Sequence, residues 1–354
     1  MTMTSDHRIT SLLGIELPII QAPMAGSAFG DMAAAVSDAG GLGSLACASL
    51  NAQQIRDEIT GIRSKTGKPL NLNFFCHTNA VFDEAKEMAW RKKLEAYYVE
   101  FGIDPSGPIP SSSRNPFDEA SCEIVEEFKP EVVSFHFGLP SAALLARVKA
   151  TGAKVLSSAT SVDEALWLEE RGCDAIIAQG FEAGGHRGIF LSDDIYSQVG
   201  TIALVPQIAD AVKVPVIASG GISDARGIRA AFALGASAVQ LGTAYLFTPE
   251  ARISAPYRQA LRNTRDNQTT LTNLFTGRPA RGIINRIIRE AGPISPMAPQ
   301  FPLAGGALLP LKGVVEKQGS GDFSSLWSGQ AARLCKELPA GELTRYLARE
   351  AGLL

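Results

Sequence analysis

One pattern recurs from residue 17 to residue 241: a short apolar run, followed in most cases by a stretch with the periodicity of an amphipathic helix. Apolar runs without polar alternation are typical of parallel strands buried on both faces. They lie at 17–21, 43–47, 70–74, 132–135, 154–157, 175–178, 214–218 and 238–241. Nothing between them marks a reversal of strand order. The pattern therefore favours an α/β fold of the closed (β/α)8, or TIM, barrel type over an open doubly wound sheet.

Two segments break this repeat. A charged helical stretch at 81–101 and a Pro/Ser-rich stretch at 104–116 follow the third run, and beyond about Glu250 the pattern turns helical. A chain of 354 residues exceeds the roughly 250 residues of an ordinary barrel. We expect 1–76 and 118–262 to form the barrel. We expect 77–117, as an insertion, and 263–354, as a helical cap, to form a substrate-side domain.

Composition narrows the class of partner. Hydrophobic residues make up 45% of the chain, enough for a large core. The net charge of −3 comes without a basic cluster, which argues against nucleic acid. The five cysteines are scattered, so we expect no metal site and a reducing compartment. The N-terminus lacks a signal-peptide core, and no apolar run approaches a membrane span. We therefore expect a cytoplasmic protein with small-molecule partners and no membrane contact.

Glycines follow the last two apolar runs. The sequence ASGGISDARG occupies 218–227, and QLGT occupies 240–243 before a short helix. In barrels the loops after strands seven and eight commonly bind phosphate through free backbone N–H groups. Tight turns would also explain one glycine pair, but two glycine sites on adjacent strand ends favour phosphate binding. We expect Gly220, Gly221, Gly242 and Thr243 to take this role.

The sixth run leads into AQGFEAGGHRG at 178–188. Gly184 and Gly185 let the backbone approach a ligand, and His186 is the side-chain type that titrates near neutral pH. We expect His186 on an exposed loop and in a functional role, rather than as a histidine that only satisfies a carbonyl. Small and amide side chains at the other strand ends, at 21–24, 71–73, 136 and 157–160, suit a flavin better than a sugar phosphate.

These motifs together resemble the nitronate monooxygenase family. QAPM at 21–24, NLNF at 71–74 and the three glycine motifs match in order and spacing, as do FTGRPARGIINR at 275–286 and GDFSSLWSGQ at 321–330. The resemblance covers nearly the whole chain. It implies an FMN-dependent barrel that oxidises alkyl nitronates, and also neutral nitroalkanes, with O2 to a carbonyl compound and nitrite.

The resemblance also implies roles for single residues. His186 takes the catalytic position, as a base or as an electrostatic anchor for the substrate. His136, Tyr257 and Ser328 are candidate substrate contacts. Arg278 and Arg281 resemble a phosphate clamp but are expected to be structural. The implied FMN contacts are Ala22, Pro23, Met24, Asn73, Gln179, Gly184, Gly185, Ser219, Gly220, Gly221, Gln240, Leu241, Gly242 and Thr243.

Several alternatives stay open. Some members carry tyrosines and a lysine where this chain has Phe301, Gly305 and Gly306, so the subgroup and its substrate range are undecided. A related FMN barrel that takes hydride from NAD(P)H, a quinone reductase or an enoyl-thioester reductase, would share the flavin motifs. A barrel isomerase or lyase would use the phosphate site for its own substrate. The sequence is compatible with a monomer or a homodimer.

Overall fold

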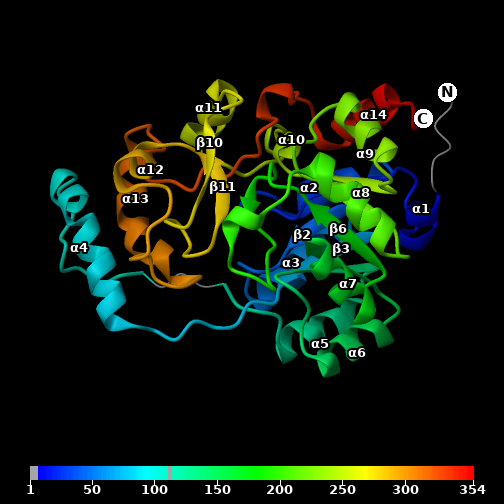
Figure 1. The fold of residues 1–354 in the computed structure, drawn as a ribbon, viewed down its shortest axis with the longest axis horizontal. Coiled ribbons are helices and arrows are strands. Elements are labelled where there is room, and N and C mark those ends of the chain that lie inside the picture. Colours follow the sequence, from blue (N-terminus) through cyan, green and yellow to red (C-terminus); the bar gives the residue numbers. More distant parts are fainter. Residues whose placement is uncertain (1–6, 111–113) are drawn as a thin grey trace.

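The computed structural model describes residues 7–110 and 114–354, and its central element is a parallel eight-stranded sheet (Figure 1). Its strand order is β1-β9-β8-β6-β5-β4-β3-β2. The two ends of the sheet meet, because Gln21 N–H donates to Leu42 O at 2.9 Å and Leu42 N–H donates to Ile19 O at 3.0 Å. The sheet thus returns on itself as a nearly closed (β/α)8 barrel, and the predicted fold class is confirmed. The barrel strands are β1 (Ile19–Gln21), β2 (Gly43–Ala46), β3 (Leu70–Phe75), β4 (Val132–His136), β5 (Lys154–Ala159), β6 (Ala175–Gln179), β8 (Val216–Ser219) and β9 (Ala238–Leu241).

Helices cover the outside of the barrel, and several begin at residues that cap them. Asn51 forms a capping box with Gln54 at the start of α3, and Asp118, Ser161 and Asp224 accept hydrogen bonds from first-turn N–H groups of their helices. Each cap therefore defines the residue at which its helix begins. The surrounding helices are α2 (Gly30–Asp38), α3 (Ala52–Arg63), α5 (Glu119–Phe128), α6 (Ala142–Ala150), α7 (Val162–Glu170), α8 (Thr201–Ala211) and α9 (Ala225–Ala233).

A short helix that the sequence analysis did not predict, α1 (Arg8–Leu13), covers the amino ends of the strands. Its Ile9 and Leu13 are buried in one cluster with Val132 and Ala175, the first residues of β4 and β6. This plug leaves the carboxyl ends of the strands as the open end of the barrel.

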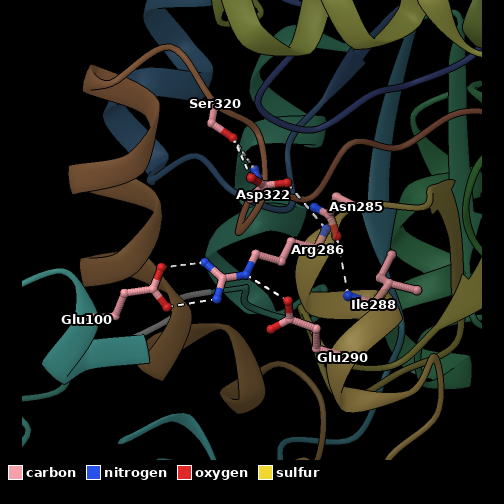
Figure 2. Close-up of polar contacts among 7 residues, drawn as sticks. All are labelled: Glu100, Asn285, Arg286, Ile288, Glu290, Ser320 and Asp322. Atoms are coloured by element: carbon pink, nitrogen blue, oxygen red, sulfur yellow. Dashed lines mark hydrogen bonds and ion pairs between the residues drawn. The ribbon is translucent and has the colours of Figure 1, made fainter. Parts of the chain in front are cut away.

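The insertion and part of the C-terminal segment share a second hydrophobic core. Trp90, Leu94 and Tyr98 of α4 (Glu84–Glu100) pack with residues of α12 (Arg286–Ala291) and α13 (Leu309–Lys317). Arg286 ties the two segments together: its guanidinium donates to both oxygens of Glu100 at 2.6 and 2.7 Å and to Glu290 at 2.9 Å (Figure 2). Figure 1 shows α4 beside α12 and α13, away from the barrel.

Two expectations for the C-terminal region are wrong. The chain beyond Glu250 is not only helical, because β10 (Thr269–Thr272) and β11 (Ala280–Ile283) form an antiparallel sheet with β7 (Gly185–His186). The last helix, α14 (Ala340–Ala351), does not belong to the cap, because its apolar face packs in the barrel core next to α2 and α9. Among the described residues, no helix has the length and apolar character needed to cross a membrane.

Candidate active site

A cavity opens at the carboxyl ends of the barrel strands, beneath the cap. It holds about 1190 Å³ of space free of protein atoms, its open mouth included. The barrel supplies most of the wall, while β7, Tyr257, Trp327 and the insertion residue Arg114 supply the side next to the cap.

The structure brings most of the predicted site residues to this one cavity. His186, His136, Tyr257 and all the predicted FMN contacts except Leu241 line it. Leu241 is completely buried in the barrel core instead, because alternate residues of β9 point to opposite faces. Ser328 does not line the cavity either. Its side chain is fully buried, and its hydroxyl donates to Gly329 O at 3.0 Å. Neither Leu241 nor Ser328 is therefore part of the cavity lining.

His186 lies in a strand, not on an exposed loop as expected. In β7 it pairs with Ala280 of β11, and its imidazole lies among aromatic rings, with ring centroids 5.4 Å from Phe301 and 5.6 Å from Trp327. The amide of Gln179 holds the backbone here, since Nε2 donates to His186 O at 2.9 Å. The side chain on the cavity wall is thus fixed from both the cap and the barrel.

The hydrogen-bond network of His186 accommodates a proton on Nε2. Its Nε2 lies 3.0 Å from Thr276 Oγ1, and that hydroxyl also lies 3.2 Å from Arg278 O. When the hydroxyl donates to Arg278 O, Nε2 donates to Thr276 and Nδ1 keeps a lone pair. Burial, and then the charge of Arg114, hold the pKa of His186 well below its ordinary value of 6.5. The imidazole is neutral at physiological pH and can accept a proton.

His136 supports His186 from the barrel side. Its Nε2 donates to His186 O at 3.3 Å, and its Nδ1 accepts from Ser158 Oγ at 3.0 Å. Burial lowers the pKa of His136 to about 3. Both ring nitrogens of His136 thus form hydrogen bonds, and the one from Nε2 positions the backbone of His186 on the cavity wall.

Another part of the cavity wall presents unused backbone donors. Gly220 and Gly221 adopt φ values of +111° and +70°, which glycine tolerates without strain. Their N–H groups, and those of Gly242 and Thr243, donate to none of the residues that the structure describes. A Cβ on Gly220 would lie 3.0 Å from Ala183 N, so the close packing also requires glycine. This is the type of backbone surface that binds phosphate in barrels.

One buried acceptor on the same wall has no protein partner. Gln240 Oε1 is buried and, within the described parts of the chain, receives no hydrogen bond. An orphaned buried oxygen is costly unless a bound group donates to it. The wall is therefore complementary to a ligand with both an anionic end and an N–H or O–H donor.

The two arginines that resemble a phosphate clamp have structural roles, as expected. Arg281 is buried beneath the ring of Phe181 and donates to the carbonyl of that residue at 3.0 Å. Arg278 stacks on Phe137, with its guanidinium carbon 4.1 Å from the ring centroid, and donates to Ile189 O. Both guanidinium groups are held by the protein, outside the cavity lining.

The sequence analysis missed several residues of the wall, above all Arg114 and Trp327. Arg114 is the only charged residue between Asp104 and Asp118. This isolated charge within a Pro/Ser-rich stretch is the one sequence feature that could have indicated a role for Arg114. Trp327 lies in GDFSSLWSGQ at 321–330, the motif in which the neighbouring Ser328 is the predicted substrate contact. Among the described residues, no group of His, Cys, Asp and Glu side chains is arranged to hold a metal ion.

The fold and the cavity together define a (β/α)8-barrel enzyme with its active site at the carboxyl ends of the strands. The family model described as nitronate monooxygenase matches residues 6–350. A nitronate monooxygenase from Pseudomonas aeruginosa is 44% identical over 349 residues, which cover 97% of this chain and 98% of the relative. The chain belongs to the nitronate monooxygenase family.

Solved structures agree with this assignment. A nitroalkane oxidase from Streptomyces ansochromogenes is 37% identical and covers 98% of both chains with a TM-score of 0.88. FabK from Thermotoga maritima is 28% identical, with a TM-score of 0.72 over 98% of this chain and 96% of its own. The architecture is thus shared across the whole length, cap included.

Proposed function

We propose that this enzyme binds FMN in the cavity and uses O2 to convert alkyl nitronates to a carbonyl compound and nitrite. Neutral nitroalkanes would enter the same reaction after loss of their α-proton. The observation that carries the proposal is the neutral imidazole of His186, which lies on a wall whose described residues include no acid. Such a wall suits a substrate that is, or becomes, an anion.

The wall has the groups that FMN needs. The N–H groups of Gly220, Gly221, Gly242 and Thr243 would hold the phosphate, and Gln240 Oε1 would accept a hydrogen bond from the ribityl chain or the ring. Bound FMN would take electrons from the nitronate and deliver them to O2, chemistry that no side chain here supplies.

The side chains would bind, orient and deprotonate the substrate. Nδ1 of His186, with its lone pair free, would accept the α-proton of a neutral nitroalkane. Thr276, by accepting from Nε2, would keep the ring in the required tautomer, and Gln179 and His136 hold its backbone. Phe301 and Trp327 flank the imidazole and would shield it from water during the reaction.

The purified enzyme tests this proposal directly. Its visible spectrum and the flavin released by heating identify the cofactor, and oxygen uptake with nitrite release from propionate 3-nitronate or 2-nitropropane measures the reaction. We expect bound FMN and nitrite formation without added nicotinamide. The proposal is wrong if the flavin is bleached anaerobically by NADH but not by a nitronate, which would indicate an NAD(P)H-dependent reductase. A protein that stays colourless after FMN is added would indicate a phosphate-binding isomerase or lyase.

A further inference from the structure

The cavity wall carries a single formal charge. Among its described lining residues, Arg114 is the only acid, lysine or arginine. Its Nη1 is buried without a hydrogen-bond partner, and no described residue accepts from the rest of its guanidinium. Arg114 as a whole is half-buried, but a buried guanidinium nitrogen without a partner is costly for the folded protein unless an anion accepts from it. This cost is unexplained by the protein alone.

The backbone around Arg114 is held firmly at the barrel mouth. Phe117 N–H donates to Phe75 O at 2.7 Å, and Pro116 bridges to Phe75 at the end of β3. The Nε2 of His77 donates to Arg114 O at 3.1 Å. Burial lowers the pKa of His77 to about 4, so its ring is neutral at physiological pH. These contacts place Arg114 on the wall independently of any ligand.

The other cations near the reacting end do not compete for this role. Arg278 also has a buried Nε without a partner, but its guanidinium donates to Ile189 O, stacks on the ring of Phe137 and does not line the cavity. Arg187 is buried and donates to Gly180 O and Gln179 O at 2.5 and 2.7 Å. The positive charge that an anionic substrate meets beside His186 is therefore that of Arg114.

We propose that Arg114 binds the nitronate group of the substrate, so that Arg114 is the electrostatic anchor and His186 acts as the base. The inference rests on the proposed function. A nitronate shares one negative charge between two oxygens, and the planar fork of a guanidinium can donate to both at once. A lysine would supply the charge without the fork.

The first test is kinetic and uses Arg114→Gln and Arg114→Lys. With ethyl nitronate we expect the KM of Arg114→Gln to rise at least about tenfold, since a hydrogen bond to a charged group is lost. The kcat should change less, and FMN content should match the wild type. Arg114→Lys should have an intermediate KM. The control is Arg91→Gln, which removes a guanidinium of the same insertion that lies outside the cavity lining.

The second test measures binding without turnover. Sodium nitrite, a planar anion with two oxygens, is titrated calorimetrically into wild-type enzyme and the two Arg114 variants. We expect the wild type to bind nitrite, Arg114→Lys to bind it more weakly, and Arg114→Gln to lose binding at least about tenfold. Absence of nitrite binding to the wild type, or equal affinity in Arg114→Gln, would overturn the inference.

Propionate 3-nitronate, which has a carboxylate as well, separates the two anionic groups. Equal losses with this compound and ethyl nitronate support a contact with the nitronate, whereas a loss confined to propionate 3-nitronate would overturn that assignment. A wild-type KM for ethyl nitronate in Arg114→Gln would also overturn it. If the FMN-loaded wild type turns over no nitronate, the proposed function fails, and the nitrite titration still decides whether Arg114 binds anions.

Discussion

At the level of single residues, the chemistry of the cavity depends on which nitrogen of His186 carries its proton. Thr276 accepts the Nε2 proton when its own hydroxyl donates to Arg278 O. The sequence could place a histidine at this strand end, but it could not assign the tautomer, since Thr276 is ninety positions further along the chain. The sequence leaves open whether His186 acts as a base or as an electrostatic anchor for the substrate. If Arg114 binds the negatively charged nitronate group, Arg114 is the anchor and His186 is the base.

His186→Asn tests the base. Asparagine keeps a polar side chain on the wall but cannot take up the α-proton. We expect FMN to stay bound and kcat/KM for neutral 2-nitropropane to fall by roughly 10²–10⁴, the usual contribution of a general base. Preformed nitronates, which need no proton removed, should lose much less. Oxygen-uptake assays with both substrates make the comparison, and equal losses would contradict the assignment.

The pH dependence of the same reaction follows from the burial of His186. Burial lowers its pKa well below 6.5, so the neutral, active form persists as the pH falls through 6.5. We therefore expect kcat/KM for neutral nitroalkanes to stay constant through this range and to decline only at more acidic pH. An inflection near 6.5 in the pH profile would indicate a solvent-exposed imidazole and count against the described site.

At the level of elements, the site depends on β7, a two-residue strand that the sequence pattern does not predict. β7 pairs with β11 of the cap, whose sequence contains Arg281 and Gly282, residues without strand preference. The barrel strands were predictable because each is an uninterrupted apolar run. The pairing of β7 with β11 was not, because it joins segments more than ninety residues apart and no local pattern specifies it.

Gly184→Ala tests the junction between this strand and the cap. A Cβ at Gly184 would lie 2.5 Å from Gly329 N and 2.7 Å from Ser328 C, both backbone atoms. We expect the wall to shift, nitronate turnover to drop and stability to fall by about 1–3 kcal/mol, as in overpacked sites. Gly61→Ala is the control, since no atom lies within 4 Å of its Cβ and alanine favours helix α3. Thermal unfolding compares the two, and equal melting temperatures would refute the predicted clash.

At the level of the whole molecule, the barrel fixed which strand ends could meet, and this made most of the cavity predictable. Residues far apart in sequence, such as Met24, Asn73 and Gln240, had to share one rim once eight parallel strands closed. Arg114 could not be found in this way, because it comes from the insertion. Its place depends on how the segment around Pro116 attaches to β3.

Acid should destabilise the protein as a whole. His136 and His77 have pKa values lowered to about 3 and about 4, so they stay neutral in the fold when the unfolded chain already binds protons. Stability is unaffected above about pH 6.5 and falls below it, by up to about 1.4 kcal/mol per pH unit for each such histidine, until the folded pKa is reached. Melting temperatures between pH 7 and pH 5 should show this decline, and His136→Asn should reduce its slope. An unchanged slope would exclude His136 as a contributor.

The closure of the barrel also sets an order for folding during synthesis. β1 pairs with β9, and α14 near the end of the chain packs next to α2 near its beginning. In a ribosome-bound chain that has not yet reached Ala238, the edge of β1 lacks its parallel neighbour β9. Helix α4 lacks its packing partner α13 until a still later stage of synthesis. Nascent chains therefore expose an open strand edge until late in translation, the stage at which association between chains competes with folding.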